Sequence, residues 1–342
     1  MTRRMAYRSP GVLAAALAAV VLSTPVAGVR AGANAVPMPA QLATLTILGD
    51  TSGNAGLRTG QWRAVRLDVR RTAAAGTTIA WASNGSPSTS RRPLLMLNGT
   101  GSPMSEWDPK LLARLATSRQ VIVFDYPGLG ESGKNPGPMT FRSLADTTAA
   151  FISAIGLDSV DVLGWSMGGF IVQEMLRAHQ ELIGRAVLAG TNPGGPKTRL
   201  GPKWVQEADS DPNAGIKTYL RTNYPNTRRA QRKGRAFVKR LTKSVNSGRY
   251  PDEAVPAKTY RQMVKAENPW LRSKRNSREL RAVSTRVLVA TGKRDVVTPA
   301  ANSRRISKLL PNAKLTLFGG AGHSFLFQKP HRIASRVSHF LG

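Results

Sequence analysis

Ser159-Val-Asp-Val-Leu-Gly-Trp-Ser166-Met-Gly-Gly-Phe-Ile-Val-Gln-Glu174 is the stretch that decides the fold. It begins as a short apolar run typical of a strand and continues as a pattern typical of a helix. The turn between the two, Gly164-Trp-Ser-Met-Gly168, fits the pattern G-x-S-x-G. A serine at such a turn is held in strained backbone geometry, so that its hydroxyl stands clear at the end of the strand. Gly164 and Gly168 approach one another across the turn, where little more than a hydrogen atom fits.

The rest of the chain alternates between strand-like and helix-like segments. Short, mostly continuous apolar runs, which suit strands buried on both faces, occupy residues 94–97, 121–124, 160–163, 186–188, 287–290 and 315–318. Helical patterns occupy residues 109–116, 141–155, 166–179 and 300–310. This alternation predicts an α/β fold with a doubly wound, mostly parallel sheet. Residues 63–69 and 77–82 alternate apolar and polar side chains around Gly76, which predicts an antiparallel hairpin at the sheet edge.

The alternation breaks between residues 191 and 282, where the pattern is polar and helix-like without a strand. We expect a helical lid there, inserted into a core made of residues 36–190 and 283–342. The formal net charge of the chain is +31, and the lid segment carries 22 basic and 7 acidic side chains. The electrostatic field of such a basic segment attracts polyanions, although a merely solvated basic surface explains the charge equally well.

The N-terminus has the pattern of an export signal. Arg3, Arg4 and Arg8 precede an apolar run of 12 residues, and Ala33-Asn-Ala35 offers a cleavage site. We therefore predict a signal peptide over residues 1–35 and a mature protein that is secreted or held in the cell envelope. Twelve apolar residues are too few to span a bilayer, which needs about 20, so we expect no membrane span in the mature chain; a short uncleaved anchor is the alternative. An exported basic protein meets anionic envelope surfaces, so nucleic acid is an unfavoured partner.

Chemistry-bearing residues follow several of the predicted strands. In an open α/β sheet, active groups lie beyond the carboxyl ends of the strands. Ser166 follows the run 160–163, Asp295 follows 287–290, and His323 follows 315–318. The chain order is therefore serine, aspartate, histidine, which is the order of an α/β-hydrolase triad.

The sequence resembles the α/β-hydrolase fold family, in its lidded, esterase-like serine hydrolase branch. Five motifs carry the resemblance: Leu97-Asn-Gly-Thr-Gly, Phe124-Asp-Tyr-Pro-Gly-Leu-Gly-Glu-Ser, Gly164-Trp-Ser-Met-Gly-Gly, Thr291-Gly-Lys-Arg-Asp-Val-Val-Thr-Pro and Gly322-His. The family pattern implies Ser166 as nucleophile, His323 as general base and Asp295 as the acid that orients it. It further implies an oxyanion hole made of the backbone N–H groups of Thr100 and Met167. Where the family often has His-Gly, this chain has Asn98-Gly99, so the hydrogen bonds of that loop must differ.

The other titratable candidates have simpler explanations. We expect His179 to end a helix, and His331 and His339 to lie on the surface of the C-terminal helix. Asp125 falls in a Pro-Gly turn, and Asp209 and Asp211 fall in the lid segment, where solvation is the expected state. The chain has no cysteine, so thiolate chemistry and cysteine-ligated metals are excluded. No motif calls for a metal or a cofactor.

The sequence thus predicts an exported serine hydrolase that cleaves a small-molecule ester, thioester or similar acyl bond through an acyl-enzyme. Four alternatives stay open within this pattern. Three are enzymes on the same fold: an amidase or peptidase, an acyltransferase, and a cofactor-free haloperoxidase-like member. The fourth is a non-enzymatic protein that binds the envelope through its charge.

Overall fold

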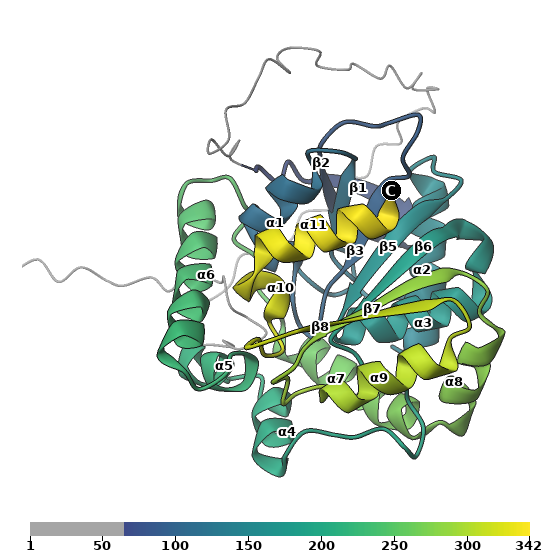
Figure 1. Cartoon of the computed structure of the whole chain (residues 1–342). Helices are drawn as coiled ribbons and strands as arrows, with labels where there is room; N and C mark the ends of the chain where they lie inside the picture. Colours follow the sequence, from purple (N-terminus) through teal and green to yellow (C-terminus); the bar gives the residue numbers. More distant parts are fainter. Residues whose placement is uncertain (1–64) are drawn as a thin grey trace, which may run out of the picture. The chain divides into compact units, whose positions relative to one another are not determined.

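The structure is a computed structural model that describes residues 65–342. The predicted signal peptide, residues 1–35, lies outside the described residues. The described part is built around an eight-stranded sheet (Figure 1). Its strands are β1 (Arg70–Ala74), β2 (Thr77–Asn84), β3 (Leu94–Leu97), β4 (Val121–Phe124), β5 (Val160–Trp165), β6 (Ile183–Ala189), β7 (Arg286–Gly292) and β8 (Ala313–Phe318).

The strand order is β1-β2-β4-β3-β5-β6-β7-β8. Strand β2 pairs antiparallel with β1 and β4, and every other pair is parallel. Strands β3, β4 and β5 are buried along their whole length, as expected for a parallel sheet covered on both faces. The predicted fold class and the six predicted apolar strands are therefore confirmed.

The predicted first strand of the edge hairpin was wrong. The hairpin forms between β1 and β2, so its first strand is Arg70–Ala74 and not residues 63–69, of which Arg63 and Ala64 lie outside the described part. The alternation in residues 65–69 still reflects burial, because Val65 and Leu67 pack into the core. The Leu67 N–H donates to the Arg249 carbonyl at 2.8 Å, so this extended segment pairs with the chain after α6 (Arg228–Asn246) and not with the sheet.

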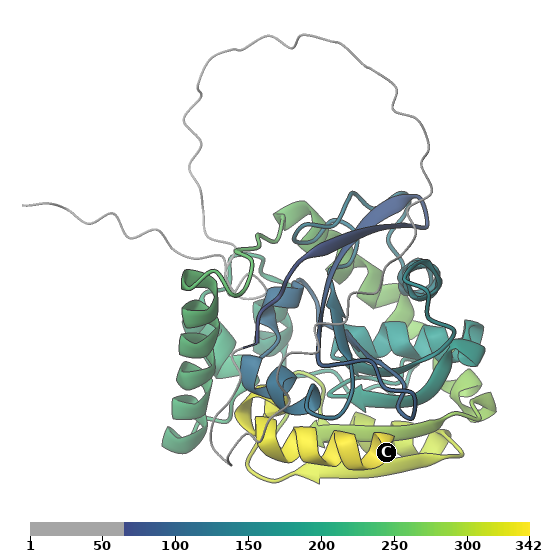
Figure 2. The same cartoon turned by 90° about the horizontal axis from the view of Figure 1, so that it is seen from above.

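Helices cover both faces of the sheet. One face is covered by α1 (Pro109–Leu115) and α11 (Pro330–Leu341), which lie side by side in both views (Figure 2). The other face is covered by α2 (Phe141–Ala154), α3 (Met167–Ala178) and α9 (Ala300–Leu309). Short helices η1 (Met104–Glu106), η2 (Gln180–Leu182) and α10 (Phe325–Gln328) lie in the connections.

The segment between β6 and β7 contains helices and no strand among residues 191–282. Its elements are α4 (Lys203–Ser210), α5 (Ile216–Asn223), α6 (Arg228–Asn246), α7 (Ala257–Arg272), α8 (Lys274–Glu279) and η3 (Leu280–Ala282). The buried positions of α6 include Ala230, Gly234, Phe237 and Leu241, which share one face at helical spacing, and its basic side chains mostly face outward. The function of this segment as a lid stays a prediction. No helix within residues 65–342 has the length and apolar character needed to cross a membrane.

Candidate active site

Ser166 lies at the junction of β5 and α3 in a strained conformation. Its backbone has φ 56° and ψ −120°, a region that side-chain-bearing residues rarely occupy. Hydrogen bonds hold it there: the Ser166 N–H donates to Ala189 O, and Ser166 O accepts from the Gly169 N–H and the Thr191 hydroxyl, each at 2.9 Å. Ser166 is partly exposed, whereas its neighbours in the chain are buried. The turn therefore presents one hydroxyl at the end of the sheet.

Close backbone packing explains the glycines beside Ser166. A Cβ atom on Gly164 would lie 2.4 Å from the Gly168 carbonyl oxygen. A Cβ atom on Gly168 would lie 2.2 Å from the Leu97 carbonyl oxygen. Real Cβ atoms do not approach backbone oxygens so closely, so neither position accepts a larger residue without displacing β3 or α3.

Asp295 lies in the loop after β7, and both oxygens of its carboxylate accept hydrogen bonds. Oδ1 accepts from the backbone N–H groups of Val297 and Thr298 at 2.9 and 2.8 Å. Oδ2 accepts from the hydroxyls of Thr291 and Thr298 at 3.1 and 2.9 Å. The side chain is buried, so these bonds fix its orientation and direct Oδ2 towards the imidazole of His323.

His323 lies in the loop after β8, with its Nδ1 atom 2.9 Å from Asp295 Oδ2. This bond places the proton of a neutral imidazole on Nδ1 and leaves Nε2 as the basic nitrogen. Burial lowers the pKa of His323, but the charge and hydrogen bond of Asp295, together with the charges of Asp209 and Glu267, outweigh that effect, so the pKa is raised overall. The ring lies against Trp165, whose Nε1–H donates to the His323 carbonyl at 3.2 Å.

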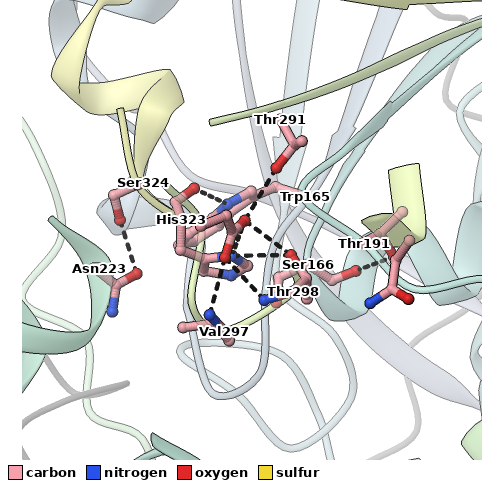
Figure 3. A network of polar contacts seen from close by, with 12 residues as sticks. Trp165, Ser166, Thr191, Asn223, Thr291, Val297, Thr298, His323 and Ser324 are labelled. Atoms are coloured by element: carbon pink, nitrogen blue, oxygen red, sulfur yellow. Dashed lines mark hydrogen bonds and ion pairs between the residues drawn. The ribbon is translucent and has the colours of Figure 1, made fainter. Parts of the chain in front are cut away.

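Ser166, Asp295 and His323 are brought together from three separate strand ends. Figure 3 shows Ser166 in the same cluster as His323 and Thr298. Within residues 65–342 no hydrogen bond joins the Ser166 hydroxyl to His323. Such bonds are often long before substrate binds. A hydroxyl, an imidazole and a buried carboxylate in this order can transfer a proton away from a nucleophile.

The loop after β3 passes close to Ser166. A Cβ atom on Gly99 would lie 3.4 Å from the Ser166 Cβ atom. The backbone N–H of Thr100 makes no hydrogen bond to any of residues 65–342, and Met167 begins α3, where N–H groups lack intrahelical partners. Both groups are thus available as donors. Asn98, which replaces the histidine common in the family, donates through Nδ2 to the Pro103 carbonyl at 2.7 Å.

Two acidic residues near the site were not anticipated from the sequence. Glu267 of α7 accepts a hydrogen bond from the Thr100 hydroxyl at 2.6 Å. Burial, followed by the charge of Asp209, raises the pKa of Glu267 to about 8. Both carboxyl groups contribute to raising the pKa of His323, although the Asp209 side chain is exposed. The sequence of α7 does not distinguish Glu267 from the other polar residues of the helix. Its position near the site comes from the tertiary contact with Thr100 alone.

The remaining candidates lie away from this cluster or serve the local structure. His179 caps α3 and lies 2.7 Å from Asp146 Oδ1. His331 and His339 are exposed on α11. Asp125 is buried in its turn and accepts from the Met104 N–H at 2.7 Å.

Comparison with known proteins identifies the family. The model of the alpha/beta hydrolase family matches residues 94–336. The chain belongs to the alpha/beta hydrolase family. That family match covers β3 through most of α11, including the loops that carry Ser166, Asp295 and His323.

Several relatives of this hydrolase are distant in sequence but match over most of their own length. A candidate non-heme bromoperoxidase of Mycobacterium tuberculosis, BpoC, is 27% identical over 77% of this chain and 97% of its own length. A poly(3-hydroxyalkanoate) depolymerase of Ectopseudomonas oleovorans is 26% identical over 73% of this chain and 84% of its own length. Among solved structures, an alpha/beta hydrolase fold protein from Chitinophaga pinensis is 27% identical, covers 81% of this chain and 98% of its own, and superposes with a TM-score of 0.70.

Proposed function

We propose that this alpha/beta hydrolase is an exported serine hydrolase that cleaves an ester, thioester or similar acyl bond. One observation carries the proposal. A buried Asp295–His323 pair with a 2.9 Å hydrogen bond stands beside a serine that the backbone holds in a strained turn. Backbone strain at Ser166 and burial of the Asp295–His323 pair both lower the stability of the protein. Acyl transfer uses both features, whereas a simple binding protein would gain nothing from them.

The proposed reaction follows from the positions of these groups. Ser166 Oγ attacks the carbonyl carbon while its proton passes to His323 Nε2, and Asp295 stabilises the resulting imidazolium. The backbone N–H groups of Met167 and Thr100 stabilise the tetrahedral oxyanion. The leaving alcohol or thiol takes the proton from Nε2, which gives the acyl-enzyme. A water molecule then attacks the acyl carbon and gives its proton to Nε2, which returns it to Ser166 as the acid leaves.

The names of relatives support hydrolysis more broadly than they support any one substrate. One relative is named as a depolymerase of a polyester, and a 2-hydroxymuconate semialdehyde hydrolase of a Pseudomonas strain is 26% identical over 73% of this chain. The bromoperoxidase name of BpoC favours the haloperoxidase-like alternative. We place acyl-bond hydrolysis first because water is its only co-reactant, whereas the alternative also needs a halide and a peroxide. The alternative is tested by bromination of a phenol with bromide and hydrogen peroxide.

Substitution of the nucleophile tests the proposal directly. Ser166→Ala should lower kcat for p-nitrophenyl esters by roughly 10⁴-fold or more, because the nucleophile is removed. Ser335→Ala, an exposed serine on α11, is the matched control and should keep full activity. A fluorophosphonate probe should label the wild type and the control but not Ser166→Ala. Equal turnover by Ser166→Ala and the wild type would remove the basis of the proposal.

The pH profile tests the base. His323 must be neutral to accept a proton. Because the pKa of His323 is raised, the midpoint of the activity loss at acidic pH should lie above 6.5, the ordinary pKa of histidine. Activity should therefore be complete at alkaline pH and fall as the pH decreases through that raised pKa. A profile that stays flat from about pH 5 to pH 8 would exclude His323 as the base.

We further propose that residues 191–282 act as a lid that selects the substrate. The support lies in two contacts of α7 with the loop after β3: the Thr100–Glu267 bond and the approach of the Gly101 N–H to Met263 Sδ at 3.3 Å. Export, and attachment to an anionic envelope surface through the basic face of this segment, remain part of the proposal. Retention on an anionic matrix that weakens steeply with salt would support the attachment, and salt-insensitive retention would exclude it.

A further inference from the structure

A hollow of about 400 Å³ lies where α6, the turn after β8 and the start of α11 meet. We call it the basic hollow. No carboxylate lines it, and five of its lining residues are lysine or arginine: Arg229, Lys233, Arg294, Lys329 and Arg332. Its lining therefore holds a concentration of positive charge without an acidic side chain to balance it.

The fold brings these cations together from segments distant in sequence. Arg229 and Lys233 are four residues apart in α6, so they share one face of that helix. Phe237 follows Lys233 by four residues and so lies close to the same face of α6, where it stacks on Phe327 of α10 with ring centroids 4.4 Å apart. This stacking holds the first turns of α6 beside the junction of α10 and α11, where Figure 1 also shows the helices adjacent.

Two helix N-termini contribute further positive potential. The N-cap of α6, Thr227, and the first residue of α11, Pro330, both line the basic hollow. The first N–H groups of a helix lack intrahelical partners, and the helix dipole is positive at that end. Both ends therefore favour an anion in the same place as the side chains do.

The charges in the basic hollow are not neutralised by the protein. None of the five cations forms an ion pair or a side-chain hydrogen bond with another of residues 65–342. The pKa of Lys329 is lowered by burial and then by repulsion from Arg332, Arg229 and Lys233. The cations are thus close enough to repel each other, and an anion among them would relieve that repulsion.

We propose that the basic hollow binds a phosphate group, either free or as the monoester of a small molecule. A phosphate monoester carries close to two negative charges at neutral pH and presents three strong acceptor oxygens, which suits several converging cations. The volume lies within the range of small-molecule sites, so it has room for the organic part of an ester. This inference is independent of the proposed hydrolase activity, because none of the five cations is part of the Ser166 site.

Calorimetric titration tests the proposal on the full chain. The probes are inorganic phosphate and glycerol 3-phosphate, with chloride at matched ionic strength as the reference anion. The test variant is Lys233→Gln/Arg332→Gln. The control variant is Arg235→Gln/Lys239→Gln, which removes the same charge from exposed positions of α6 outside the basic hollow.

Wild type and control should bind both probes, and the test variant should bind them roughly a hundredfold more weakly, since each charge-assisted contact contributes about tenfold. Tighter binding of the ester would identify a phosphorylated molecule as the ligand, and equal binding would identify free phosphate as sufficient. Equal weakening in both variants, or no binding beyond that of chloride, would overturn the proposal. Binding of long-chain polyphosphate alone would also overturn it, because that result indicates a diffuse basic surface and no defined site.

Discussion

Replacing Glu253 by glutamine should make the stability of this hydrolase less dependent on pH. Glu253 and Asp125 are both buried, and a Cβ atom on Gly130 would lie 2.3 Å from Asp125 Oδ2 and 2.7 Å from Glu253 Oε1. The two carboxyl groups therefore meet at this glycine. Glu253 Oε2 accepts from the Ser105 N–H at 3.0 Å, whereas Oε1 has no donor among residues 65–342. A proton shared with Asp125 supplies the missing partner.

The size of the effect follows from that proton. Burial, and then the charge of Asp125, raises the pKa of Glu253 from 4.5 to about 10. Between those values the folded protein holds a proton that the unfolded chain releases. The free energy of unfolding therefore falls with rising pH by about 1.4 kcal/mol per unit from this group. The stabilisation is complete below pH 4.5 and is lost progressively towards pH 10.

Urea unfolding of wild type and Glu253→Gln at pH 6, 7 and 8 measures the difference. The amide of the substituted side chain can still donate to Asp125 and accept from Ser105, but it cannot titrate. Relative to wild type, the variant should gain about 2.7 kcal/mol between pH 6 and pH 8. The comparison cancels the contributions of other groups, and Glu181→Gln, at an exposed position, should follow the wild type. Parallel pH dependences in wild type and Glu253→Gln would refute a shared proton.

Two further predictions concern the active site. Gly168→Ala should destabilise the protein by about 2–4 kcal/mol in thermal unfolding and lower ester turnover. The reason is that the new Cβ atom would lie 2.2 Å from the Leu97 carbonyl oxygen. A variant with wild-type stability and activity would contradict the packing argument. Glu267→Gln should abolish a loss of kcat/KM above about pH 8, because ionisation of Glu267 places a negative charge beside the Thr100 loop, which is part of the proposed oxyanion hole. An unchanged alkaline limb in Glu267→Gln would assign that limb to another group.

The sheet could be predicted because buried parallel strands have a distinctive pattern. Runs such as 94–97 and 121–124 are apolar at every position, as strands covered on both faces require. The alternation in residues 63–69 was less informative. It indicates that one side of an extended segment is buried, as Val65 and Leu67 are, but it does not specify the partner. The partner of Leu67 is Arg249, about 180 residues further along the chain, and local sequence carries no signal for such a contact.

The positions of Ser166, Asp295 and His323 could be predicted together because a parallel sheet places the carboxyl ends of its strands at one edge. Glu267 could not, because it lies within a polar helix and reaches Thr100 across 167 residues of sequence. A helical period identifies which side chains share a face, but not which distant loop that face contacts. The positions of site residues in loops after strands can thus be predicted from topology. The site residues that come from 191–282 cannot, because their positions depend on how the helices of that segment pack.

The net positive charge of residues 191–282 does not describe the charges that this segment places near Ser166. The segment has 22 basic and 7 acidic side chains, yet two of its acidic groups face the core, Glu253 beside Asp125 and Glu267 on Thr100, and the exposed Asp209 contributes to raising the pKa of His323. Because the pKa of Glu267 is raised to about 8, this side chain carries a negative charge beside the Thr100 loop only at alkaline pH, where it would repel an anionic substrate. The proposed acyl site has acidic side chains in its surroundings, whereas no carboxylate lines the basic hollow, where we propose that an anion binds.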